Sequence, residues 1–138
     1  MSMPIKFRLW NKEQKRFIFC YGWDYVIGCS GDVYMTNYNA SNLDIINISD
    51  YVVVVPFTGL VDCDGKEIWD GDILQHTLER EIVLLVEFRR GAYRIIDVGN
   101  TSHNGCEDGL LDEIDGHHLR YSIIGNKFEN PELLRVEE

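Results

Sequence analysis

Residues 57–74 read FTGLVDCDGKEIWDGDIL and contain two turn motifs close together. The first is Asp64-Gly65, in which glycine supplies a positive φ angle at little cost. The second is Asp70-Gly71, which stands just before an apolar pair at positions 73 and 74. The stretch therefore predicts two tight reversals, the second leading into a strand, with Trp69 available to pack beside it.

The residues before this stretch are the best candidate for the middle of the core. Val52–Val55 follow Tyr51 and place β-branched side chains on both faces of an extended chain, which favours a strand covered from both sides. Further upstream, residues 22–42 are rich in glycine, asparagine, serine and aspartate. That composition predicts a long irregular connection with one short strand near Val33–Thr36.

Alternating apolar residues predict two hairpins. In the first, apolar and polar residues alternate over 5–9, a polar turn follows at 11–15, and the run RFIFCY at 16–21 returns. In the second, apolar residues alternate over 82–88 and the tripeptide Arg89-Arg90-Gly91 turns the chain into AYRIIDV. The second hairpin has apolar residues on both faces and is the clearer of the two.

Three short elements are predicted near the C-terminus. Apolar residues of 107–114 recur at helical spacing, which predicts a short helix despite the glycine within it. Residues 121–124 have the pattern of a strand. In Asn130-Pro131-Glu132 an asparagine cap, a proline at the first helical position and an acid near the positive end of the helix dipole predict a single helical turn. This turn would press Leu133 and Leu134 onto the sheet and fix the terminus.

The chain has 138 residues, of which 45% are hydrophobic and 12% aromatic. This is enough to bury one core without disulfides or a metal, so residues 1–138 are expected to form a single domain. No apolar run approaches the roughly 20 residues of a membrane helix, and the N-terminus lacks the pattern of a signal peptide. The protein is therefore expected in the cytoplasm. Its four cysteines form no C-x-x-C pair and are expected to be reduced.

The acidic charge is concentrated in the second part of the chain. Residues 1–60 carry five Lys/Arg and five Asp/Glu, whereas residues 61–138 carry eight and eighteen, which accounts for the net charge of −10. Since binding to phosphates requires a basic face, this balance argues against general nucleic-acid binding. A charged partner would be basic. The alternative is that the acidity only keeps a small protein soluble.

Candidate reactive residues are few. His103 and Cys106 form an H-x-x-C pair, and His117-His118 follow several carboxylates, so a divalent metal site is one hypothesis. Adjacent histidines on a strand point to opposite faces, which works against both binding one ion. The fourth histidine, His76, stands apart. The acidic residues between 62 and 72 lack the ligand spacing of an EF-hand loop and are expected to form a solvated turn.

Motifs for nucleotide phosphates, dinucleotides, serine hydrolases and zinc deaminases are absent from the sequence. No side chain stands out as a nucleophile. The sequence therefore predicts a protein that is not an enzyme, with no catalytic residue, no cofactor and no bound metal.

One group of side chains is a candidate binding site. Arg89, Arg90 and Arg94 lie at the tip of the second hairpin, with Tyr93 between them. Guanidinium groups pair with phosphates and tyrosine stacks on bases, so nucleic-acid binding is one hypothesis. We favour the other, that the arginines pair with the excess carboxylates of this half, within the chain or between subunits. A further hypothesis is that the acidic residues of 107–115 imitate DNA phosphates.

Three stretches in this order resemble the signature blocks of the YopX family: IKFRLWN at 5–11, FTGLVDCDGKEIWDGDIL at 57–74 and IIGNKFENPELL at 123–134. The resemblance implies a mainly β fold with a small, partly open SH3-like barrel and short helices. It also implies a phage or prophage origin and no established activity. The stretches around 24–48 and 98–118 match nothing in the family pattern, and any special function would lie there.

The sequence thus predicts a phage accessory protein in the bacterial cytoplasm that acts by binding a protein, either a second copy of itself or a host factor. Unpaired strand edges favour self-association. Two alternatives stay open. One is a nucleic-acid-associated protein that uses the Arg89–Arg94 hairpin, and the other is a metal-dependent hydrolase that uses the histidines.

Overall fold

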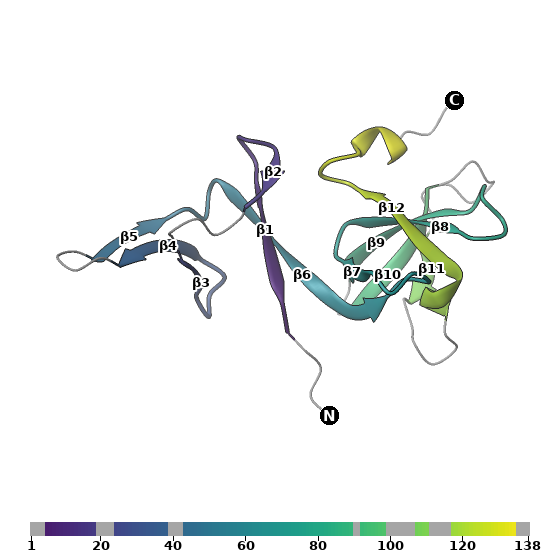
Figure 1. The fold of residues 1–138 in the computed structure, drawn as a ribbon, viewed down its shortest axis with the longest axis horizontal. Helices are drawn as coiled ribbons and strands as arrows, with labels where there is room; N and C mark the ends of the chain where they lie inside the picture. Colours follow the sequence, from purple (N-terminus) through teal and green to yellow (C-terminus); the bar gives the residue numbers. More distant parts are fainter. Residues whose placement is uncertain are drawn as a thin grey trace. The chain divides into compact units, whose positions relative to one another are not determined.

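The computed structural model describes residues 5–18, 24–38, 43–89, 92–98, 107–110 and 117–134. Most of its regular structure is β-strand, with only two short 3₁₀ helices in the described part of the chain, which confirms the mainly β class (Figure 1). The elements are, in chain order, β1 Phe7–Asn11, β2 Arg16–Phe17, β3 Asp24–Ile27, β4 Val33–Tyr38, β5 Leu43–Asn47, β6 Val52–Val61, β7 Glu67–Trp69, β8 Asp72–His76, β9 Val83–Arg89, β10 Ala92–Asp97, β11 Glu107–Leu110, the 3₁₀ helix η1 His117–Arg120, β12 Tyr121–Asn126 and the 3₁₀ helix η2 Pro131–Leu134.

The chain divides into two compact units. Unit 1 comprises Met1–Phe7 and Val55–Glu138, and unit 2 comprises Arg8–Val54. One sheet has four strands in the order β2-β1-β6-β7. Each unit buries apolar clusters of its own. The interpretation of residues 1–138 as one domain stays a prediction.

Unit 1 contains a five-stranded sheet of order β11-β10-β9-β8-β12, which curls on itself in Figure 1. The hairpin predicted around residue 90 is confirmed as β9 and β10, with Tyr93 opposite Phe88. Both faces of this sheet are covered. One face carries the cluster Ile68, Leu74, Leu84, Val86 and Ile95, and the other carries Ile73, Leu85 and Ile96. Because side chains alternate between faces, a strand covered on both sides buries consecutive residues.

The most deeply buried strand segments are therefore in β8 and β9, not in the valine run. β6 is confirmed as a strand and lies inside the four-stranded sheet. Val52 and Val55 are buried, but Val53 and Val54 are only half-buried. The prediction that Val52–Val55 forms the middle of the core is thus correct for two of its four side chains.

Both predicted Asp-Gly reversals are present. Gly65 has a φ of 82° and lies in the turn before β7, and Gly71 has a φ of 89° and lies in the turn between β7 and β8. At Gly71 an added Cβ would come within 2.9 Å of the Phe128 ring, so this glycine is required by space as well as by backbone angle.

The C-terminal strand and the helical turn are also confirmed, but the Asn130 side chain has a different role from the predicted cap. The Asn130 side chain accepts from the Asn126 N–H at 3.2 Å instead of capping η2, while the Asn126 side chain accepts from the N–H groups of Phe128 and Glu129. Leu134 packs against the second apolar face of the five-stranded sheet, as predicted. Leu133 remains 37% exposed.

Unit 2 overturns the prediction of an irregular connection. The strand expected near Val33 is present as β4, but β3 and β5 pair with it on either side to form a three-stranded antiparallel sheet. The predicted N-terminal hairpin is confirmed, with Trp10 and Phe17 opposite each other and their rings 5.0 Å apart. Leu9, Val33, Ile48 and Val52 form the buried cluster of this unit.

The helix predicted over 107–114 is wrong where the structure describes it. Residues 107–110 form β11, which pairs with β10 at the edge of the five-stranded sheet. A sheet partner satisfies backbone groups that a short, glycine-containing helix would leave partly unpaired, so tertiary pairing outweighs the weak local preference. Residues 111–114 lie outside the described ranges. In the part of the chain that the structure covers, no helix has the length and apolar character needed to cross a membrane.

Candidate binding surfaces

Residues from all three sequence blocks that resemble the family signature contact one another in unit 1. The backbone oxygen of Lys6, in the first block, accepts from the Phe57 N–H in the second at 2.9 Å. The Lys6 ammonium group pairs with the Glu67 carboxylate and lies 4.9 Å from the centre of the Phe57 ring. The Lys127 N–H, in the third block, donates to the Gly71 oxygen at 2.8 Å. The signature therefore holds strands together.

Asp62 is the buried centre of this arrangement. Only 1% of its surface is exposed. One carboxylate oxygen accepts from the N–H groups of Asp64 and Lys66, both at 2.9 Å, and the other accepts from the Ile123 N–H at 3.0 Å. Asp72 has a similar role, because its carboxylate accepts from the Trp69 N–H at 2.7 Å. The acidic run is thus partly structural, since two of its carboxylates satisfy turn amides instead of facing solvent.

The described histidines also bond to the backbone. His76 Nδ1 accepts from the N–H groups of Leu78 and Glu79 at 3.1 and 3.0 Å, which orders the turn after β8. His118 is buried, and its Nδ1 lies 2.6 Å from the Val61 oxygen. These ring nitrogens contact backbone groups. A histidine that acts as a general acid or base needs its nitrogen within hydrogen-bond reach of a substrate.

The remaining candidates for metal binding are His103, Cys106 and His117. His103 and Cys106 lie outside the described residues, as does the side chain of His117. Across the ranges that the structure describes, no group of three or more His, Cys, Asp and Glu side chains is placed to hold a metal ion.

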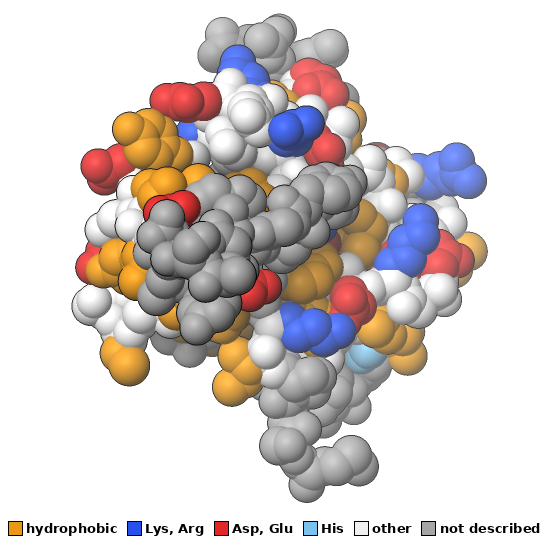
Figure 2. Space-filling model, turned by 60° about the vertical axis from the view of Figure 1, so that its left-hand side comes forward, with side chains coloured by type: hydrophobic (Ala, Val, Ile, Leu, Met, Phe, Trp, Pro, Cys, Tyr) orange, Lys and Arg blue, Asp and Glu red, His pale blue; other side chains and the backbone are white. Residues whose placement is uncertain are grey.

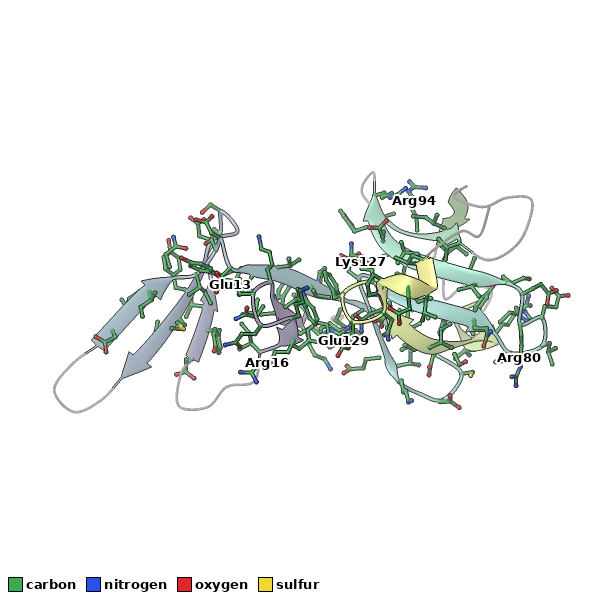
Figure 3. The ribbon with its side chains drawn as sticks, turned by 90° about the horizontal axis from the view of Figure 1, so that it is seen from above. Glu13, Arg16, Arg80, Arg94, Lys127 and Glu129 are labelled. Carbon is green, nitrogen blue, oxygen red and sulfur yellow. The ribbon has the colours of Figure 1, made fainter. Side chains whose placement is uncertain are left out.

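The arginine hairpin is largely paired internally. Arg89 Nη2 lies 2.7 Å from Glu87 Oε1, and Lys127 Nζ lies 2.9 Å from Glu87 Oε2. Arg94 Nε donates to the Arg89 backbone oxygen at 2.9 Å. Arg94 and Lys127 are labelled in Figure 3. Arg90 lies outside the described residues. The hypothesis that these arginines pair with nearby carboxylates therefore gains support at Arg89.

The pKa of Glu87 also reflects the internal pairing of charges at this hairpin. Burial acts to raise the pKa of Glu87, but the hydrogen bonds and charges of Lys127 and Arg89 outweigh it and hold the pKa below its ordinary value. Burial raises the pKa of Tyr93 and also that of Asp70, which accepts from the Phe88 N–H at 2.9 Å. Phe88, 55% exposed, contacts Tyr93 edge to face at 5.2 Å. The hairpin thus presents an aromatic pair beside a cluster of paired charges.

Unit 2 contains a groove of about 930 Å³ that the sequence did not indicate. Its apolar lining joins the cluster of this unit and includes Phe17, Ile18, Tyr25, Met35, Ile48, Tyr51 and Val52. Its polar lining comes from the β1–β2 hairpin. Glu13 and Arg16, both labelled in Figure 3, lie there with Asn11 and Gln14. An apolar surface with a few charged and amide groups around it is typical of binding sites for other molecules.

Apolar side chains of unit 2 also reach solvent outside the groove. Val26 and Ile27 on β3 are 49% and 37% exposed, and Ile45 and Ile46 on β5 are 59% and 43% exposed. Figure 2 shows hydrophobic side chains at the molecular surface among charged ones. Both surfaces of this unit belong to the stretch around 24–48 or flank it. That any special function lies in the stretch around 24–48 stays a prediction, and the sequence analysis named none of these residues.

Comparison with known proteins gives a family and a fold. A family model described as YopX protein matches residues 6–135. The X-ray structure of protein yopX from Bacillus subtilis is similar with a TM-score of 0.58 and 20% sequence identity, covering 96% of this chain and 97% of that one. The crystal structure of protein EF1440 from Enterococcus faecalis is similar with a TM-score of 0.59 and 21% identity, covering 97% and 100%. No curated protein matches the chain.

Proposed function

The chain belongs to the YopX family, and for this member we propose a non-enzymatic role: it binds an extended, partly apolar segment of a partner protein in the groove of unit 2. The observation that supports the proposal is the chemistry of the groove. Its lining combines Met35 with the aromatic side chains of Phe17, Tyr25 and Tyr51, which are residue types that dominate protein-binding surfaces.

The charge of unit 2 favours a protein segment over a nucleic acid. Residues 8–54 carry four Lys/Arg and five Asp/Glu, so the unit has a net charge of −1, and a nearly neutral unit gains little from releasing counterions on phosphates. The groove itself contains one base, Arg16, and one acid, Glu13. Arg16 Nε is already bonded to Gln14 Oε1 at 2.9 Å. A segment with bulky apolar side chains and polar flanks is the occupant that matches this lining.

The wider setting is part of the same proposal. The family resemblance implies a phage or prophage gene, so we place the protein in the cytoplasm of a bacterial host, where a host factor supplies the segment. The paired state of Arg89 makes the hairpin of Arg89, Arg90, Tyr93 and Arg94 the weaker candidate surface.

The test uses a library of displayed extended peptides selected on the wild-type protein. Selected peptides are expected to share bulky apolar residues. Tyr51→Ala is expected to weaken their binding roughly tenfold, because a half-exposed aromatic anchor contributes about 1–2 kcal/mol. The backbone bonds of Tyr51, its N–H to Ile48 and its oxygen to Lys12, remain in this variant, so the fold is preserved.

Phe88→Ala is the matched control, since Phe88 is an exposed aromatic residue of unit 1. It should leave peptide affinity unchanged. If Phe88→Ala abolishes binding and Tyr51→Ala does not, the groove is not the site. Binding of nucleic acid that falls steeply with salt and with Arg89→Ala would favour the hairpin alternative. Catalytic turnover on a substrate panel would contradict a non-enzymatic role.

A further inference from the structure

The three-stranded sheet of unit 2 has two free edges among its described strands. Its order is β3-β4-β5, so β4 is paired on both sides and β3 and β5 are each paired on one. An unpaired strand edge presents a row of N–H and C=O groups that another strand can bind. Tyr25 of β3 lines the groove, whereas no residue of β5 is among its described lining residues.

The register identifies the outward groups of β5. The Ile48 N–H donates to the Val33 oxygen at 2.9 Å, and the pairing continues with Ile46 opposite Met35 and Asp44 opposite Asn37. In an antiparallel pair, alternate residues bond to the partner strand. The N–H and C=O groups of residues 43, 45 and 47 therefore point away from β4, toward the free edge.

The edge of β3 is shorter. The Gly28 N–H donates to the Asp32 oxygen at 2.8 Å, and β3 pairs with β4 over Asp24–Ile27. By the same alternation, only residues 25 and 27 have outward backbone groups. β5 thus offers the longer row of free donors and acceptors.

The sequence of β5 carries few of the residues that usually protect an edge strand. Natural edge strands are commonly blocked by lysine, by proline or by other charged residues. Residues 24–47 contain no lysine, arginine or proline, and β5 contains a single charged residue, Asp44. Instead Ile45, at the centre of the edge, is 59% exposed. The strand combines a free backbone with an apolar surface, which is the combination that favours pairing.

Charge makes a second copy of this chain a suitable partner. Residues outside 8–54 carry nine Lys/Arg and eighteen Asp/Glu, a net charge of −9, so two unit 1 surfaces repel each other. Unit 2 has a net charge of only −1. A contact through unit 2 therefore brings together two surfaces of nearly neutral net charge.

We propose that two copies of the protein associate through antiparallel pairing of β5 with β5 around a twofold axis at Ile45, which joins their three-stranded sheets. This register places Ile45 opposite Ile45 and residue 43 opposite residue 47, and it exchanges roughly six hydrogen bonds by the antiparallel pattern. Asp44 faces Ile46 of the second copy, so no charge faces its own counterpart. The inference goes beyond the peptide-binding function and does not rest on it.

Proline at position 45 tests the pairing selectively. The Ile45 N–H points away from β4, so Ile45→Pro removes no hydrogen bond within the chain but removes two from the centre of the dimer interface. The dimer dissociation constant, measured by sedimentation equilibrium, should rise roughly 10- to 100-fold. Ile45→Val keeps the N–H and the β-branched shape and should dimerise like the wild type. Circular dichroism verifies that both variants are folded.

Hydrogen exchange of the wild-type protein supplies a measurement independent of any variant. The amides of Ile45 and Asn47 should exchange more slowly at high protein concentration, whereas those of Tyr25 and Ile27 on the other edge should not change. The wild-type protein is measured over a concentration series in 100-fold steps. If it is still monomeric at roughly millimolar concentration, the proposal is overturned. Concentration-dependent protection of both edges, or a folded Ile45→Pro variant that dimerises normally, would also overturn it.

Discussion

Replacing Asp62 by alanine is expected to destabilise unit 1 strongly, because one carboxylate serves three backbone N–H groups. Two of these donors, on Asp64 and Lys66, belong to exposed turn residues and can turn to water when the carboxylate is lost. The third, on Ile123, lies on a half-buried strand. An unsatisfied buried donor costs about 1–3 kcal/mol and each turn amide adds about 0.5 kcal/mol, so the total loss is about 2–4 kcal/mol.

Urea unfolding followed by circular dichroism measures this loss. With a slope of about 2 kcal/mol per molar urea, the midpoint of Asp62→Ala should fall by roughly 1–2 M. Asp64→Ala is the matched control, since it removes a neighbouring exposed carboxylate of the same turn and should shift the free energy of unfolding by less than about 0.5 kcal/mol. Equal midpoints for the two variants would refute the view that Asp62 joins the turn to β12.

Three further outcomes are expected from the same assay. Gly71→Ala should lower the free energy of unfolding by about 2–3 kcal/mol, because the alanine would combine a positive φ with a Cβ clash. Gly65→Ala, with open space around the residue, should lower it by only about 1 kcal/mol. Equal losses would contradict the clash. The pKa of Glu87 lies below its ordinary value, so the ionised carboxylate stabilises the folded state. This stabilisation is present above the pKa of the unfolded state and disappears as the pH falls through the pKa of the folded state. Glu87→Gln should therefore cost about 0.5 kcal/mol at pH 7 and nothing at pH 2, and a cost that persists in acid would argue against the ion pairs. Leu134→Ala should lower the free energy of unfolding by about 1–2 kcal/mol, and Leu133→Ala by less than about 0.5 kcal/mol. Equal effects of the two substitutions would show that the C-terminal turn does not pack on the sheet.

The elements that the sequence predicted well are those whose partners are close in the chain. The alternation over 82–88 indicated a strand with two apolar faces, and β9 has this structure, with Leu84 and Val86 on one face and Leu85 on the other. The Asp-Gly pairs indicated reversals because the positive φ is a local requirement. The pairing of Arg89 with a carboxylate was also expected, and its partner is only two residues away.

The elements that the sequence missed are stabilised by distant residues. β3 lies within residues 22–42, whose overall composition is typical of loops, and it becomes a strand because β4 supplies a backbone partner, as it does for β5 on its other side. Residues 107–110 had a weak helical pattern and became an edge strand because β10 offered a ladder to join. The groove could not be predicted either, since its lining combines the β1–β2 hairpin with Tyr25, Met35 and Val52, which lie on three later strands of the chain.

The sequence by itself determined the mainly β class, the positions of the two Asp-Gly turns, the hairpin of β9 and β10 and the membership of a family, because alternation, turn chemistry and motif order are properties of neighbouring residues. The tertiary structure alone decided that Asp62 faces three amides from two segments, that residues 24–47 form a sheet with open edges, and that an apolar groove lies beside it. These features depend on contacts between residues far apart in the chain, and such contacts leave no periodic trace in the sequence.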